Sequence, residues 1–289
     1  MSLYDGVDLR LNVPHSARMY DYYLGGFTNF AADREAAGQA LAVLPWVRSA
    51  ARANRAFMHR STRSLAEAGL EQFLDIGTGI PTSPNLHEVA QQVNPRARVV
   101  YVDNDPIVLS HAQALLTGAR EGRTAYIEAD LADPVALLTA PGLRDTIDLS
   151  RPVALSLNAV LHFIPDGPDG PDALGGPEAP EGRGIPGPDR AHAIVECLKA
   201  ALAPGSALVV SHLTADFAPA EVARVSGIYR AAGTPLQARS RRELARFLTG
   251  WTALDPGLVP VHRWRPADAA DTAVTDTEAS GYAAVAVKP

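Results

Sequence analysis

The stretch Gln72-Phe-Leu-Asp-Ile-Gly-Thr-Gly-Ile-Pro-Thr82 decides the fold of this chain. Its first residues, 72–76, form a short apolar run that predicts a strand, and the run leads through Asp75 into a turn with Gly77 and Gly79. Such a turn brings bare backbone close to a ligand, because ligands of open α/β sheets bind outside the carboxyl ends of the strands. The acid before the first glycine needs a cationic or hydrogen-bond-donating partner, and an α-ammonium group would satisfy it.

The same turn disfavours a dinucleotide. The dinucleotide fingerprint requires glycine at position 82, where this chain has Thr82, preceded by the stiff Pro81. A nicotinamide-dependent oxidoreductase is therefore an alternative that this turn argues against.

Strands and helices alternate after residue 69. Five expected strands cover residues 72–76, 98–102, 124–127, 152–157 and 207–211, and helices at 84–93, 106–116, 134–138 and 191–202 connect them. This alternation indicates βαβ crossovers and a parallel sheet with helices on both faces. Two further strands, 259–264 and 282–287, have no expected helix between them and are predicted to pair antiparallel. We therefore expect an α/β fold with a Rossmann-like, seven-stranded, mostly parallel sheet and an antiparallel last strand.

The N-terminal part is predicted to be a helical cap, residues 1–68, in front of a main domain over residues 69–289. Its helices are expected at 16–24, N-capped by Ser16 and ended by Gly25; at 33–41, N-capped by Asp33; and at 46–65. Asn54 interrupts the apolar stripe of the third helix, either as a satisfied buried amide or as a residue that points into a pocket. Residues 167–188 are rich in Gly and Pro and are expected to form a flexible loop.

Composition narrows the function classes. The 289 residues carry 26 Lys+Arg against 32 Asp+Glu, a net charge of -6, so no global basic field favours nucleic acid. Cys197 is the only cysteine, which excludes a disulfide framework or a zinc cluster within one chain. No signal peptide or membrane-spanning run is visible, and the histidines lack metal-ligand spacing. We expect a cytoplasmic protein with no metal, no membrane and no nucleic-acid partner, and the oligomeric state is left open.

Two more acids follow the next expected strands. Asp103 lies 24 residues after Gly79, where a carboxylate can accept both hydroxyls of a ribose. Asp130, in Glu128-Ala-Asp130, can accept from an exocyclic adenine amine. Three acids at consecutive strand ends, the first beside two glycines, favour a nucleoside ligand that carries an amino acid.

The order of these motifs resembles the class I S-adenosylmethionine (SAM)-dependent methyltransferases over residues 70–289: DxGxG, then YVDND, then EAD, then a strand that runs into Leu161-His162. A narrower resemblance spans nearly the whole chain. It is to a bacterial family of S-adenosyl methyltransferases that is otherwise described as a domain of unknown function. The residues that carry it are Pro14, 17–18, 20–21, 24–26, 29–30, 33–34, 54–55, Phe57, 72–82, Asn85, 87–88 and 101–106.

The resemblance implies roles for individual residues along SAM. Asp75 would face the methionyl ammonium, Asp103 the ribose hydroxyls and Asp130 the adenine amine, with Gly77 and Gly79 lining the methionine and ribose. Other residues expected at the cofactor are Thr78, Asn104, Leu131, Asn158 and Arg34. Arg34 could bind the methionyl carboxylate or an acidic substrate, or form a surface salt bridge instead.

The methyl-accepting side offers three candidates. His162 follows the fourth strand and is either a general base or part of the pocket wall, and Asn158 could orient an acceptor. Tyr20 lies on the first helix, which in this fold commonly closes over the cofactor. No Pro-Pro pair exists for an amino-methylase motif, and Cys197 does not follow Pro. We expect methyl transfer to an oxygen or nitrogen atom of a small molecule, with a non-catalytic SAM-binding module as the alternative.

Overall fold

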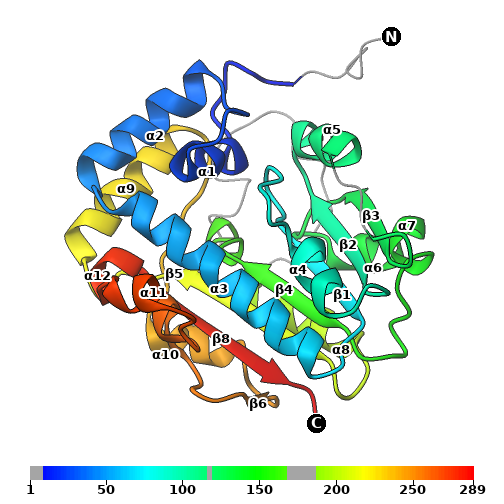
Figure 1. Ribbon diagram of the computed structural model, residues 1–289. Coiled ribbons are helices and arrows are strands. Elements are labelled where there is room, and N and C mark those ends of the chain that lie inside the picture. The colour runs from blue at the N-terminus through cyan, green and yellow to red at the C-terminus, as the bar shows by residue number, and fades with distance from the viewer. Residues whose placement is uncertain (1–8, 116–118, 168–186) are drawn as a thin grey trace.

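A mostly parallel sheet runs through the centre of the computed structural model, which describes residues 9–115, 119–167 and 187–289 (Figure 1). Its strand order is β3-β2-β1-β4-β5-β8-β6, with β7 paired to β8. The strands are β1 (Gln72–Ile76), β2 (Arg98–Asp103), β3 (Arg123–Glu128), β4 (Ala154–Asn158), β5 (Ala207–Leu213), β6 (Thr252–Ala253), β7 (Val259–Pro260) and β8 (Gly281–Val287). β1 to β5 are parallel, and β8 is antiparallel to β5, β6 and β7. The Rossmann-like fold is confirmed, with eight strands where seven were expected.

The strand order places the site. β2 and β3 lie on one side of β1, whereas β4 and β5 lie on the other, so the direction of the chain across the sheet reverses at β1. Open α/β sheets bind their ligands in the crevice at such a switch point. The residues that follow β1 and β4 therefore border the binding crevice.

Helices cover both faces of the sheet. Alternate side chains of β1 point to opposite faces: Phe73 packs with Phe57 and Leu86 on one face, and Leu74 packs with Leu137 and Ile194 on the other. The first face is covered by α3 (Val47–Glu67) and α4 (Leu86–Val93). The other helices of the sheet domain are α5 (Pro106–Leu115), α6 (Pro134–Thr139), α7 (Pro141–Arg144), α8 (Arg190–Ala200) and α10 (Arg241–Arg246).

The cap is built from two distant parts of the chain. α1 (Ser16–Leu24) and α2 (Ala31–Val43) pack against α9 (Pro219–Ala231), and the three lie together at one end of the sheet (Figure 1). Met19 and Tyr23 of α1 share one buried cluster with Val225 and Tyr229 of α9. The first two helices of the expected cap are thus joined by α9, a helix that our sequence analysis missed, whereas the third, α3, packs on the sheet.

Both predicted N-caps in this region are wrong. The N-cap of α1 is His15, not Ser16, and its Nδ1 accepts from the Ala17 backbone N–H. Asp33 lies one turn inside α2 rather than at its start. Its buried carboxylate accepts from the backbone N–H groups of Phe30 and His15, 2.8 Å each, so it satisfies free donors of the α2 N-terminus and ties α1 to α2.

The last part of the chain also differs from expectation. The antiparallel pairing is confirmed, but β7 ends at Pro260, and a 3₁₀ turn follows over Val261–Arg263. Val261 and Trp264 are both buried, and their spacing of three residues suits such a turn, which is why the expected strand 259–264 does not continue. Two short helices, α11 (Ala269–Ala273) and α12 (Asp276–Ala279), then precede β8, where we expected none.

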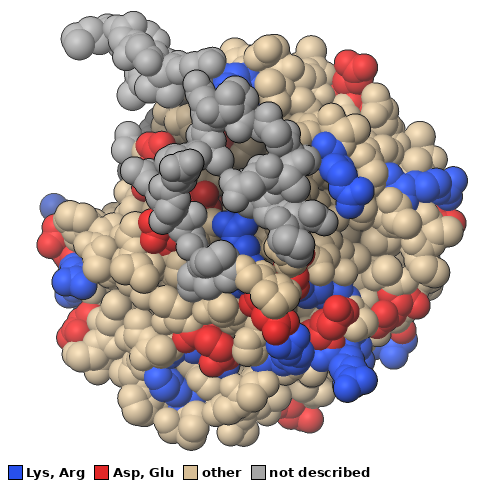
Figure 2. All heavy atoms as spheres, turned by 180° about the vertical axis from the view of Figure 1, so that it is seen from behind, with Lys and Arg blue, Asp and Glu red and all other residues tan. Residues whose placement is uncertain are grey.

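Two expectations concern the loops and the surface. Of the expected loop 167–188, residues 168–186 lie outside the described residues. Seen from behind, the described surface carries acidic and basic side chains interspersed with one another (Figure 2). In the described part of the chain, no helix combines the length and the apolar character needed to cross a membrane.

The β1 turn packs directly under the segment that follows β4. Gly77 has φ +74°, and a Cβ built on it would lie 2.4 Å from Cγ2 of Val160. Glycine is needed here for two reasons: the left-handed backbone is costly for other residues, and the space of a side chain is already occupied.

Gly77→Ala should therefore lower the free energy of unfolding by about 2–4 kcal/mol, the sum of a left-handed alanine and an overpacked contact. Urea denaturation followed by circular dichroism measures it. Gly250→Ala is the matched control, because Gly250 has φ +77° and open space around its Cβ position. Adding Val160→Ala to the Gly77→Ala variant removes the side chain that the new methyl group meets. It should recover the part of the lost unfolding free energy by which Gly77→Ala exceeds Gly250→Ala. Equal losses of unfolding free energy in Gly77→Ala and Gly250→Ala would contradict a costly contact between the new side chain and Val160.

Candidate functional site

Three acids meet in one cavity of about 480 Å³ at the carboxyl ends of the parallel strands. Asp75 belongs to β1, Asp103 ends β2, and Asp130 follows β3. Asp75 is buried, Asp103 is half-buried and Asp130 is exposed at the rim. The structure therefore brings together the three acids that the sequence placed at consecutive strand ends.

The turn after β1 presents backbone to this cavity. Gly79 has φ +67°, and a Cβ built on it would meet no atom within 4 Å, so space lies open above it. Its backbone N–H donates to Oδ2 of Asp103 at 2.8 Å, while Oδ1 of Asp103 accepts from the backbone N–H of Asp105 at 3.0 Å. Thr78 Oγ1 donates to the Asp75 carbonyl at 3.1 Å. These bonds hold the Asp103 carboxylate in one orientation and leave lone pairs on both of its oxygens.

Burial changes the ionisation of Asp75. The pKa of its carboxyl is raised to about 7, mainly by loss of hydration; the Arg55 guanidinium opposes this shift, and the neighbouring Asp103 carboxylate adds to it. Arg55 lines the cavity from α3 and donates to the backbone carbonyls of Thr82 and Pro84. Because ionised Asp75 is poorly solvated, a cation that enters the cavity would favour the carboxylate form.

The end of β4 supplies an amide without a partner. Both the Nδ2 and the Oδ1 atoms of Asn158 are buried, and neither makes a hydrogen bond in the described structure. The next residue, Ala159, has φ +52°, and its backbone N–H donates to the carbonyl and to Oγ of Ser211 on β5. A buried amide in this state costs free energy unless a ligand satisfies it. Asn158 is among the residues that line the cavity.

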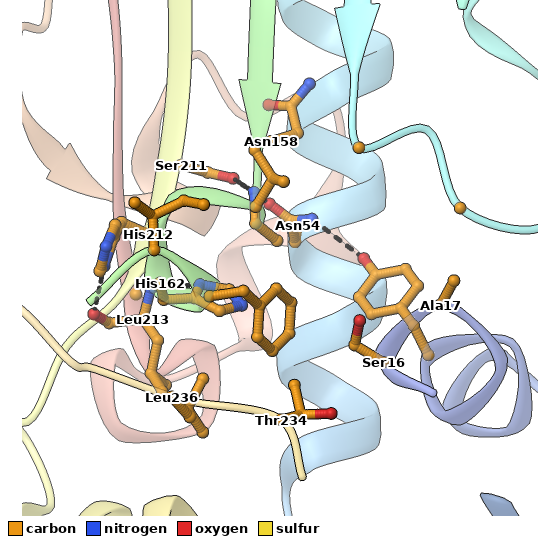
Figure 3. Close-up of a pocket in the computed structure, with 18 of the residues that line it drawn as sticks. Ser16, Ala17, Asn54, Asn158, His162, Ser211, His212, Leu213, Thr234 and Leu236 are labelled. Carbon is orange, nitrogen blue, oxygen red and sulfur yellow. Dashed lines mark hydrogen bonds between the residues drawn. The ribbon is translucent and has the colours of Figure 1, made fainter. Parts of the chain in front are cut away.

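Asn54 joins the cap to the sheet. Its Oδ1 accepts from Ser211 Oγ, and its Nδ2 donates to the Tyr20 hydroxyl at 2.9 Å (Figure 3). Of the two alternatives for Asn54, the structure combines both, since this amide is satisfied and also lines the cavity. The Tyr20 hydroxyl itself donates to the Ala51 carbonyl at 2.9 Å. Its proton is thus engaged, and burial raises its pKa, so Tyr20 forms cavity wall rather than a base.

His162 is placed in the cavity wall, but its environment opposes the role of general base. Burial, with a smaller contribution from the Arg239 guanidinium, lowers its pKa to about 3. The Leu213 backbone N–H approaches Nδ1 at 3.5 Å, which leaves the proton of the neutral ring on Nε2. A neutral imidazole with so low a pKa is not a base near neutral pH, so His162 forms part of the cavity wall.

The remaining predicted cofactor residues divide into two groups. Thr78, Asn104 and Leu131 line the cavity beside the acids. Arg34 is not among the described residues that line it. Its Nη1 donates to the Asn29 carbonyl at 2.6 Å and to Asn29 Oδ1 at 3.2 Å, so this nitrogen is engaged within the cap. Our expectation that Arg34 contacts the cofactor is therefore not supported by its placement.

Sequence reasoning missed several residues of the cap side. The hydroxyls of Tyr23 and Tyr229 lie 3.1 Å apart, and both residues line the cavity together with Phe163 and Leu236. The spacing of Val222, Val225 and Tyr229 was a detectable signal for α9, because it follows one face of a helix. No local signal reveals that this face meets Tyr23.

Comparison with known proteins identifies the family. The model of a family described as S-adenosyl methyltransferase matches residues 5–175 and 184–289. A protein of the DUF574 family from Streptomyces avermitilis is 46% identical, with 98% of this chain and 100% of that chain covered and a TM-score of 0.87. A Thermobifida fusca protein, provisionally named a methyltransferase, is 38% identical, with 99% of each chain covered and a TM-score of 0.82. A comparison with curated proteins finds no match.

These matches span the cap as well as the sheet domain, so they cover the cavity and the helices that close it. They confirm the family that the sequence motifs suggested, and with it S-adenosylmethionine as the cofactor. The chain belongs to the S-adenosyl methyltransferase family and is a SAM-dependent methyltransferase.

Proposed function

We propose that this enzyme transfers a methyl group to an oxygen or nitrogen atom of a small molecule that binds between the strand ends and the cap. The observation that carries the proposal is the cavity itself, in which Asp75, Asp103 and Asp130 converge and the buried amide of Asn158 has no partner. Proteins leave such an amide unpaired at functional sites, where a ligand completes it.

The donor and acceptor groups of the cavity fit the cofactor. The buried Asp75 carboxylate suits the α-ammonium group, and Asp103, held by two backbone N–H groups, has free lone pairs for the ribose hydroxyls. Asp130 suits the exocyclic adenine amine, beside the buried, apolar Leu131. The open space above Gly79 admits a ligand against the backbone. When bound, SAM supplies a methyl group on a positively charged sulfur.

The residues of the cavity would act by holding the cofactor and the methyl acceptor in place. Asp75 and Asp103 would fix the two ends of the methionyl-ribose part, and Asn158 would hold the acceptor atom near them. Methyl transfer requires in-line placement above all, and fixed geometry can supply much of the rate. His162 and Tyr20 would form part of the cavity wall, since neither is free to take a proton. A module that binds SAM without catalysis would have the same cavity. It is distinguished from an enzyme because it would not convert SAM to S-adenosylhomocysteine with any acceptor.

The first test is the loss of a ribose contact. Asp103→Ala should weaken S-adenosylhomocysteine binding at least tenfold, because each hydrogen bond to a charged group contributes about 1.5–3 kcal/mol and 1.4 kcal/mol is tenfold in affinity. Isothermal titration calorimetry with wild type and variant measures it.

Asp103 also holds Gly79, so a control for the turn is needed. The Ser83→Ala variant loses a hydroxyl bond to Glu88 in the segment that follows the same turn, and Ser83 does not line the cavity. It should bind within about threefold of wild type, a change of roughly 0.6 kcal/mol. Unchanged affinity in Asp103→Ala would remove Asp103 from the cofactor site.

The second test uses the raised pKa of Asp75. In the free protein this carboxyl is mostly protonated at pH 6, and a bound ammonium group favours its ionised form. Binding of S-adenosylhomocysteine at pH 6 should therefore release about one proton, and almost none at pH 8, so affinity rises as the pH increases toward 7. Calorimetry at each pH in phosphate and in imidazole, two buffers that differ in ionisation enthalpy, counts the protons.

The matched variants are Asp75→Asn and Asp130→Asn. The first should abolish proton release at pH 6, whereas the second, which changes a carboxylate at the rim of the same cavity, should preserve it. Release that persists in Asp75→Asn would assign the titration to another group.

A further inference from the structure

The boundary between the cap and the sheet contains a buried group of ionisable side chains. Arg18 of α1 and Asp33 of α2 belong to the cap, and His15 precedes α1, whereas Asp105 belongs to the turn after β2. Arg18 is 2% exposed, Asp33 0% and Asp105 4%. A buried charge loses its hydration, which is costly unless an opposite charge or hydrogen bonds compensate for it. The partners of these residues therefore decide how the cap is attached to the sheet.

Arg18 lies between two carboxylates. Its Nε is 3.6 Å from Oδ1 of Asp33 and 3.5 Å from Oδ2 of Asp105, and neither Nε nor Nη1 makes a hydrogen bond in the described structure. Its Nη2 donates to the Val13 carbonyl at 3.0 Å. The attraction between Arg18 and Asp105 is therefore one of charge, in surroundings from which water is largely excluded.

Asp105 depends on this attraction more than Asp33 does. Both oxygens of Asp33 already accept backbone N–H groups. Of the Asp105 oxygens, Oδ1 accepts from the Ile107 N–H at 2.9 Å, but Oδ2 makes no hydrogen bond in the described part of the chain. This oxygen faces Arg18 and also His15, whose Nδ1 lies 3.1 Å away. Both of these partners come from the cap side of the boundary.

Asp105 is joined in turn to the acid proposed for the ribose. Its backbone N–H donates to Oδ1 of Asp103 at 3.0 Å, while Oδ2 of Asp103 accepts from Gly79. Burial raises the pKa of the Asp103 carboxyl, and these two N–H groups oppose the shift, so they also favour its ionised form. One of the two bonds that orient Asp103 therefore comes from a residue whose side chain is paired with α1.

The first turn of α1 borders the same cavity as Asp103. Ser16 and Ala17, both labelled in Figure 3, line the cavity together with Asp103. Ala17 also packs against a small apolar cluster that contains Ile80, from the turn after β1, and Ile107, from α5. The cap thus contacts the turn after β1 and the start of α5, the two segments that flank Asp103 and supply its backbone donors.

We propose that Arg18 and Asp105 are positioning residues for the cofactor: their ion pair holds the turn after β2 against α1 and so keeps the Asp103 carboxylate aimed at the ribose hydroxyls. The inference rests on the proposed function of the cavity, in which Asp103 binds the ribose. Neither Arg18 nor Asp105 lines the cavity, so both act through Asp103. The cap is then part of the cofactor site as well as its cover.

Two ligands that differ only in the ribose hydroxyls separate positioning from general stability. The full-length protein is titrated by calorimetry with S-adenosylhomocysteine and with the analogue that lacks both ribose hydroxyls. We call the ratio of the two dissociation constants the hydroxyl preference. It should favour S-adenosylhomocysteine by roughly tenfold or more in the wild type, because the lost hydrogen bonds are to a charged group, and it should disappear in Asp103→Ala.

Variants of the ion pair should lower this preference. Asp105→Asn keeps an oxygen for the Ile107 N–H but removes the charge that faces Arg18, and Arg18→Met removes the opposite charge. In each, the hydroxyl preference should fall by about threefold or more, while the affinity for the analogue stays within about twofold of wild type. The double variant Arg18→Met/Asp105→Asn leaves neither member of the pair without its partner, so it tests the same prediction if a single variant does not fold.

Arg60→Met is the matched control for lost stability. Arg60 is also largely buried, forms an ion pair with Asp271 at 2.8 Å and does not line the cavity. Like the Arg18→Met variant, it should lower the midpoint of thermal unfolding. Unlike that variant, it should keep the hydroxyl preference of the wild type.

The outcomes separate the two levels of the argument. If the wild type does not bind S-adenosylhomocysteine, or if Asp103→Ala keeps the hydroxyl preference, the proposed cofactor role of Asp103 fails, and this inference fails with it. If Asp103→Ala loses the preference but the folded variants of Arg18 and Asp105 keep it, Asp103 remains at the ribose and the positioning role is wrong. An equal fall in Arg60→Met would also overturn the positioning role, because lost stability alone would then explain the effect.

Discussion

The backbone of the β1 turn must be bare, and the site depends on this constraint. Val160 occupies the space of a side chain at Gly77, and the cavity occupies the space of one at Gly79. The hydrogen bond from the Gly79 N–H to Asp103 then joins the turn to the end of β2. The segments after β1, β2 and β4 are thereby held together, and Asp75, Asp103 and Asp130 line one cavity.

A second constraint holds the segment after β4. Arg239, almost fully buried, donates to the carbonyls of Leu161 and Ile164 and forms an ion pair with Asp166 at 2.7 Å. The same guanidinium contributes to the lowered pKa of His162. Burial is the larger cause of that low pKa, so His162 is uncharged near neutral pH. The charged residues that line the cavity are the three strand-end acids together with Arg55 and Arg190.

Much of the fold was predictable because its signals are local. The runs of β1 and β2 are apolar, and Gly25 ends α1 in a left-handed conformation, as expected. The capping box of Ser240 and Glu243 at the start of α10 is a local pattern of the same kind. Other features depend on partners far along the chain. The buried carboxylate of Asp33 binds the backbone of both cap helices, a role that local spacing cannot reveal.

For the site, the sequence by itself determined the family, the cofactor and the strand ends at which the acids lie, because the parallel strands of a βαβ sheet present their carboxyl ends at the same edge. Only the tertiary structure decided the ionisation and the partners of the side chains. Tyr23 meets Tyr229 across 206 residues, burial makes His162 a poor base, and Arg34 bonds to the cap. These properties depend on desolvation and on contacts between distant segments, which exist only once the chain has folded.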